Sequence, residues 1–191
     1  TDLSRSAESV ESTLRQIAIE LKRAVAIPVA VKVSPYFTAF GHVAQQLDRA
    51  GVDGIVMFNR FYQPDIDIRT MTAGPSLELS RSAELLLRLR WLAILFGRIN
   101  ASLIVTGGVE TKDDAIKALL AGAQGVQVVS ALLRHGPGFM MTLRDGLSRW
   151  MAWHEIESLE SVRGRLSLSG IEDPSAFERA NYIRSLHSWN H

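Results

Sequence analysis

Apolar residues follow two alternating patterns along the chain: helical spacing, three and four positions apart, and short continuous β-branched runs. The helical pattern predicts helices over residues 10–25, 38–50, 81–98 and 138–153, and a further helix beginning at Thr111. The continuous runs predict strands over residues 27–33, 54–58, 102–105 and 125–129. Such runs are typical of parallel strands that are buried on both faces.

The order of these elements predicts an α/β fold, because strands that alternate with helices form a parallel sheet. Four strands suffice for a small open sheet, whereas a complete (β/α)8 TIM barrel takes ~250 residues. We therefore interpret residues 1–166 as the C-terminal four β/α units of such a barrel. Residues 167–191 follow as a C-terminal helical extension. A short helix ending at Gly164 and a last helix opening at Asp173 complete this interpretation.

The connection over residues 60–80 is too long for an ordinary strand-to-helix loop of ~2–6 residues. Within it, Asp65 and Asp67 alternate with Ile66 and Ile68, which is typical of a half-exposed strand with an acidic solvated face. The sequence therefore predicts a lid or a small hairpin in this connection.

A glycine pair, Gly107 and Gly108, follows the third predicted strand and precedes a helix that begins with the capping-box-like pair Thr111 and Asp114. Glycine has no Cβ, so a phosphate can approach the backbone closely, and a helix N-terminus nearby adds partial positive charge. In (β/α)8 barrels the common phosphate site is built from the last two such loops. The loop is therefore a candidate phosphate site; the alternative is a plain tight turn.

Composition excludes several classes of protein. A net charge of +1, without basic runs interleaved with aromatic residues, argues against nucleic-acid binding. The chain has no cysteine, which excludes disulfides and fits a cytoplasmic location. The polar start predicts no signal peptide, and no apolar run reaches the ~20 residues of a membrane span. His187 and His191 are four residues apart but lack a carboxylate partner, so no metal site is predicted.

An ordered series of short motifs over residues 27–166 resembles the dihydroorotate dehydrogenase family. The motifs are Pro28-Val29, Val31-Lys32-Val33-Ser34-Pro35, Ala50-Gly51-Val52-Asp53-Gly54, Asn59, Thr106-Gly107-Gly108-Val109, Asp114-Ala115, Ala121-Gly122-Ala123, Val126-Gln127, Ala131-Leu132, Gly136-Pro137, Ile156-Glu157-Ser158-Leu159-Glu160 and Arg163-Gly164. The tail over residues 171–191 lies outside the general pattern and indicates a dihydroorotate dehydrogenase-like subgroup.

The resemblance implies a flavin-dependent barrel that oxidises dihydroorotate to orotate in pyrimidine biosynthesis, with FMN at the C-terminal rim. It implies cofactor contacts from Lys32, Phe58, Thr106, Gly107, Gly108, Val129 and Ser130. A lysine at the position of Lys32 approaches the flavin ring, where a fixed ammonium stabilises the negative charge of reduced flavin. Asn59 resembles the family's substrate-binding asparagine, whose amide both donates and accepts hydrogen bonds. An ordinary surface lysine and a turn asparagine are the structural alternatives.

The chain also departs from the family pattern. Val129 and Ser130 stand where the family has Gly-Thr, and residues 77–80 replace a glycine-rich run. The resemblance places the proton-abstracting base in the N-terminal half of the barrel, so no catalytic residue is predicted here. The partners implied are a small-molecule substrate, the other half of the barrel and a second copy in a homodimer. The alternatives are a non-flavin phosphate-binding (β/α)8 enzyme and a catalytically inactive binding protein of the same fold.

Overall fold

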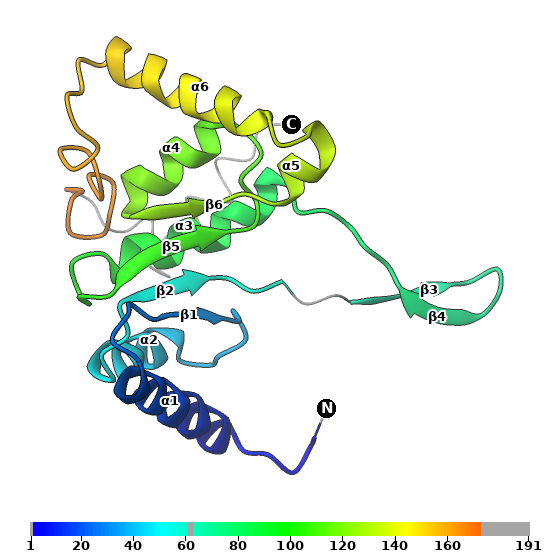
Figure 1. Cartoon of the computed structure of the whole chain (residues 1–191). Helices are drawn as coiled ribbons and strands as arrows, with labels where there is room; N and C mark the ends of the chain where they lie inside the picture. The colour runs from blue at the N-terminus through cyan, green and yellow to red at the C-terminus, as the bar shows by residue number, and fades with distance from the viewer. Residues whose placement is uncertain (1, 61–62, 173–191) are drawn as a thin grey trace.

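The computed structural model describes residues 2–60 and 63–172, and its centre is a parallel sheet (Figure 1). The sheet contains four strands in the order β1 (Ala30–Val33), β2 (Gly54–Met57), β5 (Ser102–Thr106) and β6 (Gly125–Gln127). Every neighbouring pair in the sheet is parallel. The sheet order thus follows the chain order, and the predicted α/β fold with a parallel sheet is confirmed.

Helices connect the strands, as parallel pairing requires. The helices are α1 (Ala7–Ala24), α2 (Phe40–Arg49), α3 (Leu85–Leu95), α4 (Lys112–Ala121), α5 (Ser130–His135) and α6 (Phe139–Trp153). A 3-10 turn, η1 (Ser82–Glu84), leads into α3, so the helix predicted over residues 81–98 starts later and ends earlier. Gly97, at φ +75°, follows Phe96, the C-cap of α3, in a conformation that glycine adopts without strain.

The core lies between the central strands and the helices packed on them. All four residues of β2 are buried, as expected for a strand paired on both sides. Phe40 of α2 packs edge-on against Phe58 and Trp91, with ring centroids 4.9 and 5.0 Å apart. Helix α3 also packs on α4, and α4 packs on α6. The aromatic cluster fixes α2 and α3 beside the carboxyl end of β2.

Strand β1 corrects one expectation. Its sequence predicted a strand over residues 27–33 that is buried on both faces, but β1 begins at Ala30 and Ile27 is 68% exposed. Only Val33 of the strand is buried, whereas Ala30 and Lys32 are exposed. The reason is position: among the described residues β1 pairs with β2 alone, so one edge of it remains uncovered.

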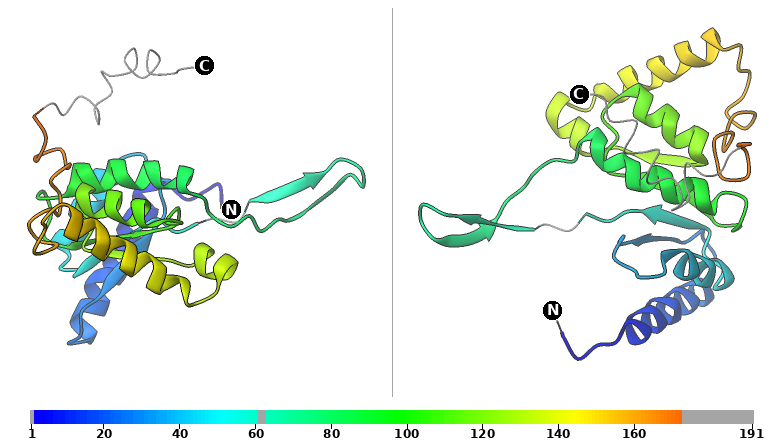
Figure 2. Two further views of the ribbon diagram at one scale, coloured as in Figure 1. Left: turned by 90° about the horizontal axis from the view of Figure 1, so that it is seen from above. Right: turned by 180° about the vertical axis from the view of Figure 1, so that it is seen from behind.

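The long connection after β2 contains an antiparallel hairpin of β3 (Pro64–Asp67) and β4 (Thr72–Pro75). The hairpin extends away from the sheet and helices in every view (Figures 1 and 2). All residues of β3 are exposed. The predicted hairpin is therefore present, whereas the described residues show no element that it covers.

The segment after α6 corrects a second expectation. Residues 154–172 form turns and bends, so the predicted short helix ending at Gly164 is wrong. The N–H groups of Gly164 and Leu166 donate to the carbonyls of Leu119 and Leu120 in α4, at 3.0 and 2.8 Å, instead of closing helical turns. The predicted last helix and His187 and His191 lie outside the described residues. Within residues 2–60 and 63–172, no helix is long and apolar enough to cross a membrane.

Candidate functional site

The carboxyl ends of all four parallel strands border one cleft of about 250 Å³. We call it the strand-end cleft, and it lies where open α/β sheets bind ligands. Its lining residues are Lys32, Phe58, Asn59, Arg60, Leu77, Leu79, Ser80, Thr106, Gly107, Val109, Gln127, Val129, Ser130 and Leu133. The residues come from four strand ends and from the segment between the hairpin and η1, so the fold gathers positions far apart in the sequence.

Seven of the eight site residues predicted from the sequence line this cleft: Lys32, Phe58, Asn59, Thr106, Gly107, Val129 and Ser130. Gly108 does not line it. Lys32 and Asn59 are exposed at the ends of neighbouring strands. The N–H of Asn59 donates to the carbonyl of Val33 at 2.7 Å, which fixes its backbone beside β1 and leaves the amide side chain at the cleft.

Phe58 contributes differently from its neighbours. Its side chain is 1% exposed and its ring packs on Phe40 in the core. Phe58 therefore supports the floor of the cleft, and its ring has almost no surface left for a ligand. Val129 is the opposite case, because it is 61% exposed at the start of α5.

The two glycines are explained by packing against α3. Gly107 and Gly108 have φ of +82° and +81°. A Cβ on Gly107 would lie 2.9 Å from Nη2 of Arg88, and one on Gly108 would lie 2.5 Å from the backbone nitrogen of Leu85. The N–H of Gly108 donates to Oγ of Ser80 at 3.2 Å. Gly108 thus serves the contact between the strand end and α3, and its N–H is already bonded within the protein.

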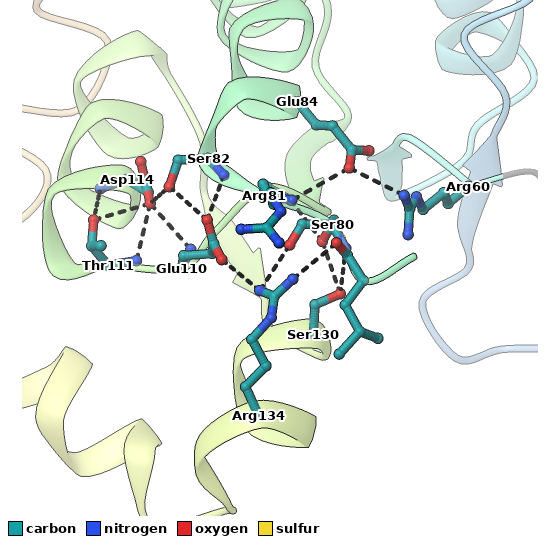
Figure 3. A network of polar contacts seen from close by, with 12 residues as sticks. Arg60, Ser80, Arg81, Ser82, Glu84, Glu110, Thr111, Asp114, Ser130 and Arg134 are labelled. Carbon is teal, nitrogen blue, oxygen red and sulfur yellow. Dashed lines mark hydrogen bonds and ion pairs between the residues drawn. The ribbon is translucent and has the colours of Figure 1, made fainter. Parts of the chain in front are cut away.

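A polar network holds the segment over residues 79–82 against the strand ends (Figure 3). Ser130 Oγ accepts hydrogen bonds from the N–H and the hydroxyl of Ser80, at 3.0 and 2.9 Å. Arg134 of α5 donates to the carbonyls of Leu79 and Ser80, at 2.9 and 3.0 Å, and pairs with the carboxylate of Glu110. Ser130 is therefore held in place by the segment over residues 79–82.

The predicted start of α4 is confirmed and belongs to the same network. Thr111 Oγ1 accepts the N–H of Asp114 at 3.2 Å, and Asp114 accepts the N–H of Thr111 at 3.0 Å, which is a capping box. Burial raises the pKa of Asp114, but hydrogen bonds from Ser82, Glu110 and Thr111 outweigh burial, and the net pKa lies below its usual value of 3.8. Asp114 is therefore an ionised anchor between η1 and α4.

Several lining residues were not predicted from the sequence. Gln127 is the last residue of β6, Lys32 is the last but one of β1, and Asn59 lies just after β2. A polar residue near the end of an apolar run was therefore the available signal for Gln127. Ser80 had no such signal, because its role depends on the distant Ser130 and Gly108. Within the part of the chain that the structure describes, no three histidine or acidic residues gather as a metal site would require.

Comparison with known proteins shows the family of the chain. The family profile described as dihydroorotate dehydrogenase matches residues 3–151, so the chain belongs to the dihydroorotate dehydrogenase family. The chain is 31% identical, over 80% of its length and 52% of the relative, to dihydroorotate dehydrogenase B (NAD(+)), catalytic subunit, of Shouchella clausii. It is 34% identical to the protein of the same description from Methanocaldococcus jannaschii, over 75% of the chain and 48% of the relative. The chain thus spans about half the length of the curated relatives it matches.

Proposed function

We propose that this chain is part of an FMN-dependent oxidoreductase that converts dihydroorotate to orotate. The observation that carries the proposal is the gathering of seven residues, assigned by the family resemblance, around one cleft at the strand ends. Family membership supports it independently. A substrate with a planar ring and a carboxylate suits the polar side chains that the strand ends present there.

We also propose that residues 1–166 form the C-terminal half of a (β/α)8 barrel, to which this sheet contributes four strands. Four parallel strands that are adjacent in sequence order, each followed by a helix, support this assignment. β1 and β6 each pair with one strand among the described residues, so four further β/α units have two edges to join. Those units would supply the proton-abstracting base.

The hairpin exposes three apolar side chains, Ile66, Ile68 and Met71, which support the proposal of a homodimer.

The residues of the strand-end cleft fit FMN in part. The Lys32 ammonium, the Ser130 hydroxyl and the Gly107 backbone offer cationic and donor groups to the phosphate and the electron-rich ring. Gly108 does not fit a direct contact, because its N–H already donates to Ser80. When bound, the flavin supplies a two-electron acceptor for a hydride. Lys32 then holds positive charge beside the ring, and Asn59 orients the substrate through its amide.

The test is a flavin titration of the full-length protein, followed by visible absorption under anaerobic dihydroorotate. We expect bound FMN whose absorption bleaches with dihydroorotate. Lys32→Met is expected to weaken FMN binding by about tenfold, as loss of a charge-assisted contact predicts. Lys117→Met is the matched control, because Lys117 is an exposed lysine of α4 that lies outside the cleft.

The other outcomes separate the alternative functions. Flavin that binds but stays oxidised would favour the second candidate function, a catalytically inactive binding protein. The hydrogen bond from the Gly108 N–H to Ser80 supports this candidate, because that N–H is already bonded within the protein. Absence of flavin binding in the full-length protein would contradict the proposal and favour a non-flavin phosphate-binding barrel. Equal affinities of the two lysine variants would remove Lys32 from the cofactor site.

A further inference from the structure

The hydroxyl of Ser130, which lines the strand-end cleft, receives two hydrogen bonds from one residue. Its Oγ accepts the N–H of Ser80 at 3.0 Å and the hydroxyl of Ser80 at 2.9 Å. A serine hydroxyl has two acceptor lone pairs and one proton to donate. Both lone pairs are therefore filled, and within residues 2–60 and 63–172 no protein atom accepts the hydroxyl proton of Ser130. That proton is the hydrogen-bonding capacity that this hydroxyl offers to a ligand in the cleft.

Ser80 has its own hydrogen bonds arranged in the same direction, and it is buried. The N–H of Gly108 donates to Ser80 Oγ at 3.2 Å, and Ser80 Oγ donates onward to Ser130. The three residues thus form a chain of hydrogen bonds that runs one way, from Gly108 through Ser80 to Ser130. Hydrogen bonds in such a chain polarise one another, so the hydroxyl at its end becomes a stronger donor.

Arg134 holds the backbone of the same segment in place (Figure 3). Its guanidinium donates to the carbonyls of Leu79 and Ser80, at 2.9 and 3.0 Å, and pairs with the carboxylate of Glu110. Arg134 lies one helical turn after Ser130 in α5, so the helix that carries Ser130 also holds the backbone of Ser80. The N–H and the hydroxyl of Ser80 are thereby kept directed at Ser130 Oγ.

We propose that Ser80 is a positioning residue that makes Ser130 a dedicated hydrogen-bond donor, so that this corner of the strand-end cleft selects a phosphoryl group. Ionised phosphoryl oxygens only accept hydrogen bonds, and a bond to a charged oxygen is stronger than one between neutral groups. An alcohol at the same place accepts the bond but donates none in return, since Ser130 has no lone pair left. Ser80 acts through Ser130 rather than on the ligand itself. This inference rests on the proposed function, because it takes Ser130 as a contact of the FMN phosphate.

Riboflavin, which carries an alcohol where FMN carries a phosphate, is the discriminating probe for the full-length protein. Quenching of flavin fluorescence measures both affinities. We expect Ser80→Ala to weaken FMN binding by about three- to tenfold, the range for loss of one hydrogen bond, and riboflavin binding by less than about twofold. Ser76→Ala is the matched control and is expected to change neither affinity. Ser76 is exposed on the same segment and lines a second cleft, between the hairpin and α3, but not the strand-end cleft.

A double-mutant cycle separates positioning from a general effect on the fold. In a Ser130→Ala background, Ser80→Ala is expected to cause no further loss of FMN affinity, because the hydroxyl through which Ser80 acts is gone. Equal losses in the two backgrounds would overturn the proposal, and so would equal weakening of FMN and riboflavin. Tighter FMN binding by Ser80→Ala would overturn it as well, since Ser80 would then stand in the place of the phosphate.

Inorganic phosphate tests the same corner of the cleft without a flavin. In an NMR titration of the unsubstituted protein, compared with chloride at equal ionic strength, we expect shifts at the amides of Ser130 and Gly108. Gly108 does not line the cleft, so its amide proton is expected to move because the hydrogen bonds through Ser80 become more polarised. The amide of Ser76 is expected to stay unchanged.

The phosphate titration decides the proposal even if Ser80→Ala does not fold. A shift at Ser130 with none at Gly108, no shift at Ser130, or the same shifts with chloride would each overturn it. Because this measurement contains no flavin, the failure of the proposed function and the failure of this inference are distinguishable. Phosphate shifts in a protein that binds no flavin would contradict the proposed function alone.

Discussion

At the scale of single residues, Gly108 shows how one position serves two structural demands. Its φ of +81° favours glycine, and its missing Cβ leaves room for the backbone of Leu85 at the start of α3. Gly51, just after α2, has nearly the same φ of +84° but open space around it. The pair therefore separates conformational strain from steric contact.

We predict that Gly51→Ala lowers the free energy of unfolding by roughly 1–2 kcal/mol, the cost of a left-handed conformation for an L-residue. Gly108→Ala is expected to cost roughly 1–3 kcal/mol more, because its Cβ would also overpack against Leu85. Urea unfolding of both variants measures the difference. Equal losses would show that the contact with Leu85 relaxes at little cost.

The sequence predicted that candidate site residues lie near the ends of their strands, but it did not predict what each side chain contacts. Lys32, Asn59 and Ser130 were assigned through the family resemblance, and the ends of the parallel strands bring all three to one cleft. Phe58 was assigned to the cofactor, yet its ring is buried on Phe40. Burial of a ring depends on a distant helix, which local sequence does not reveal.

At the scale of elements, α4 is held at its N-terminus by more than its own capping box. Asp114 Oδ2 accepts the hydroxyl of Ser82 at 2.6 Å and the N–H groups of Glu110 and Thr111, at 3.1 and 3.0 Å. Ser82 belongs to η1, so a single carboxylate oxygen joins the starts of two helices. The capping box was predicted from Thr111 and Asp114, whereas the contact with Ser82 was not.

We predict that Asp114→Asn lowers the free energy of unfolding by roughly 1.5–3 kcal/mol at neutral pH, the range for hydrogen bonds to a charged group. The folded pKa lies below 3.8, so the unfolded chain binds the proton more readily. The contribution of Asp114 is therefore complete above the unfolded pKa and is lost as pH falls through the lower folded value.

Urea unfolding across the acidic range checks this sign. The loss caused by Asp114→Asn should shrink as pH falls below 3.8. Asp113→Asn is the matched control, because Asp113 is exposed on the same helical turn and its side chain bonds only Lys112 among the described residues. A loss that does not change with pH would show that the carboxylate charge of Asp114 is not what stabilises α4.

Elements with strong periodicity were predictable, and elements defined by tertiary contacts were not. Residues 138–153 were predicted as a helix, and α6 covers Phe139–Trp153. Residues 154–172 form turns and bends, and two of their N–H groups, those of Gly164 and Leu166, bond to the end of α4 instead of continuing a helix. Likewise, the sequence of β1 resembles that of a central strand, but its place at the sheet edge leaves Lys32 exposed.

At the scale of the whole molecule, the sheet places two clefts side by side and joins them through Asn59 and Arg60. The polar network of Arg134, Glu110 and Ser80 fixes the wall of one cleft, and Arg88 forms part of the other. Neither arginine was singled out from the sequence, because its burial results from long-range packing. The parallel sheet itself was predictable from the alternation of elements alone.

We predict that amide hydrogen exchange follows the position of each strand in this sheet. The amides of β2 and β5 should exchange slowest, because both strands pair on two sides. Those of the hairpin should exchange fastest, since an exposed two-stranded hairpin is marginally stable in water. Hydrogen exchange of the intact chain, read by mass spectrometry, measures all of these segments at once.

Strand β1 makes the same measurement a test of the half-barrel proposal. Among the described residues β1 pairs with β2 alone, so its outward amides should exchange quickly in this chain. In the full-length protein a further strand would pair with that edge, and the exchange of β1 should slow toward that of β2, while β2 itself stays unchanged. If β1 exchanges equally fast in both proteins, no strand joins this edge, and the sheet does not close into a barrel through β1.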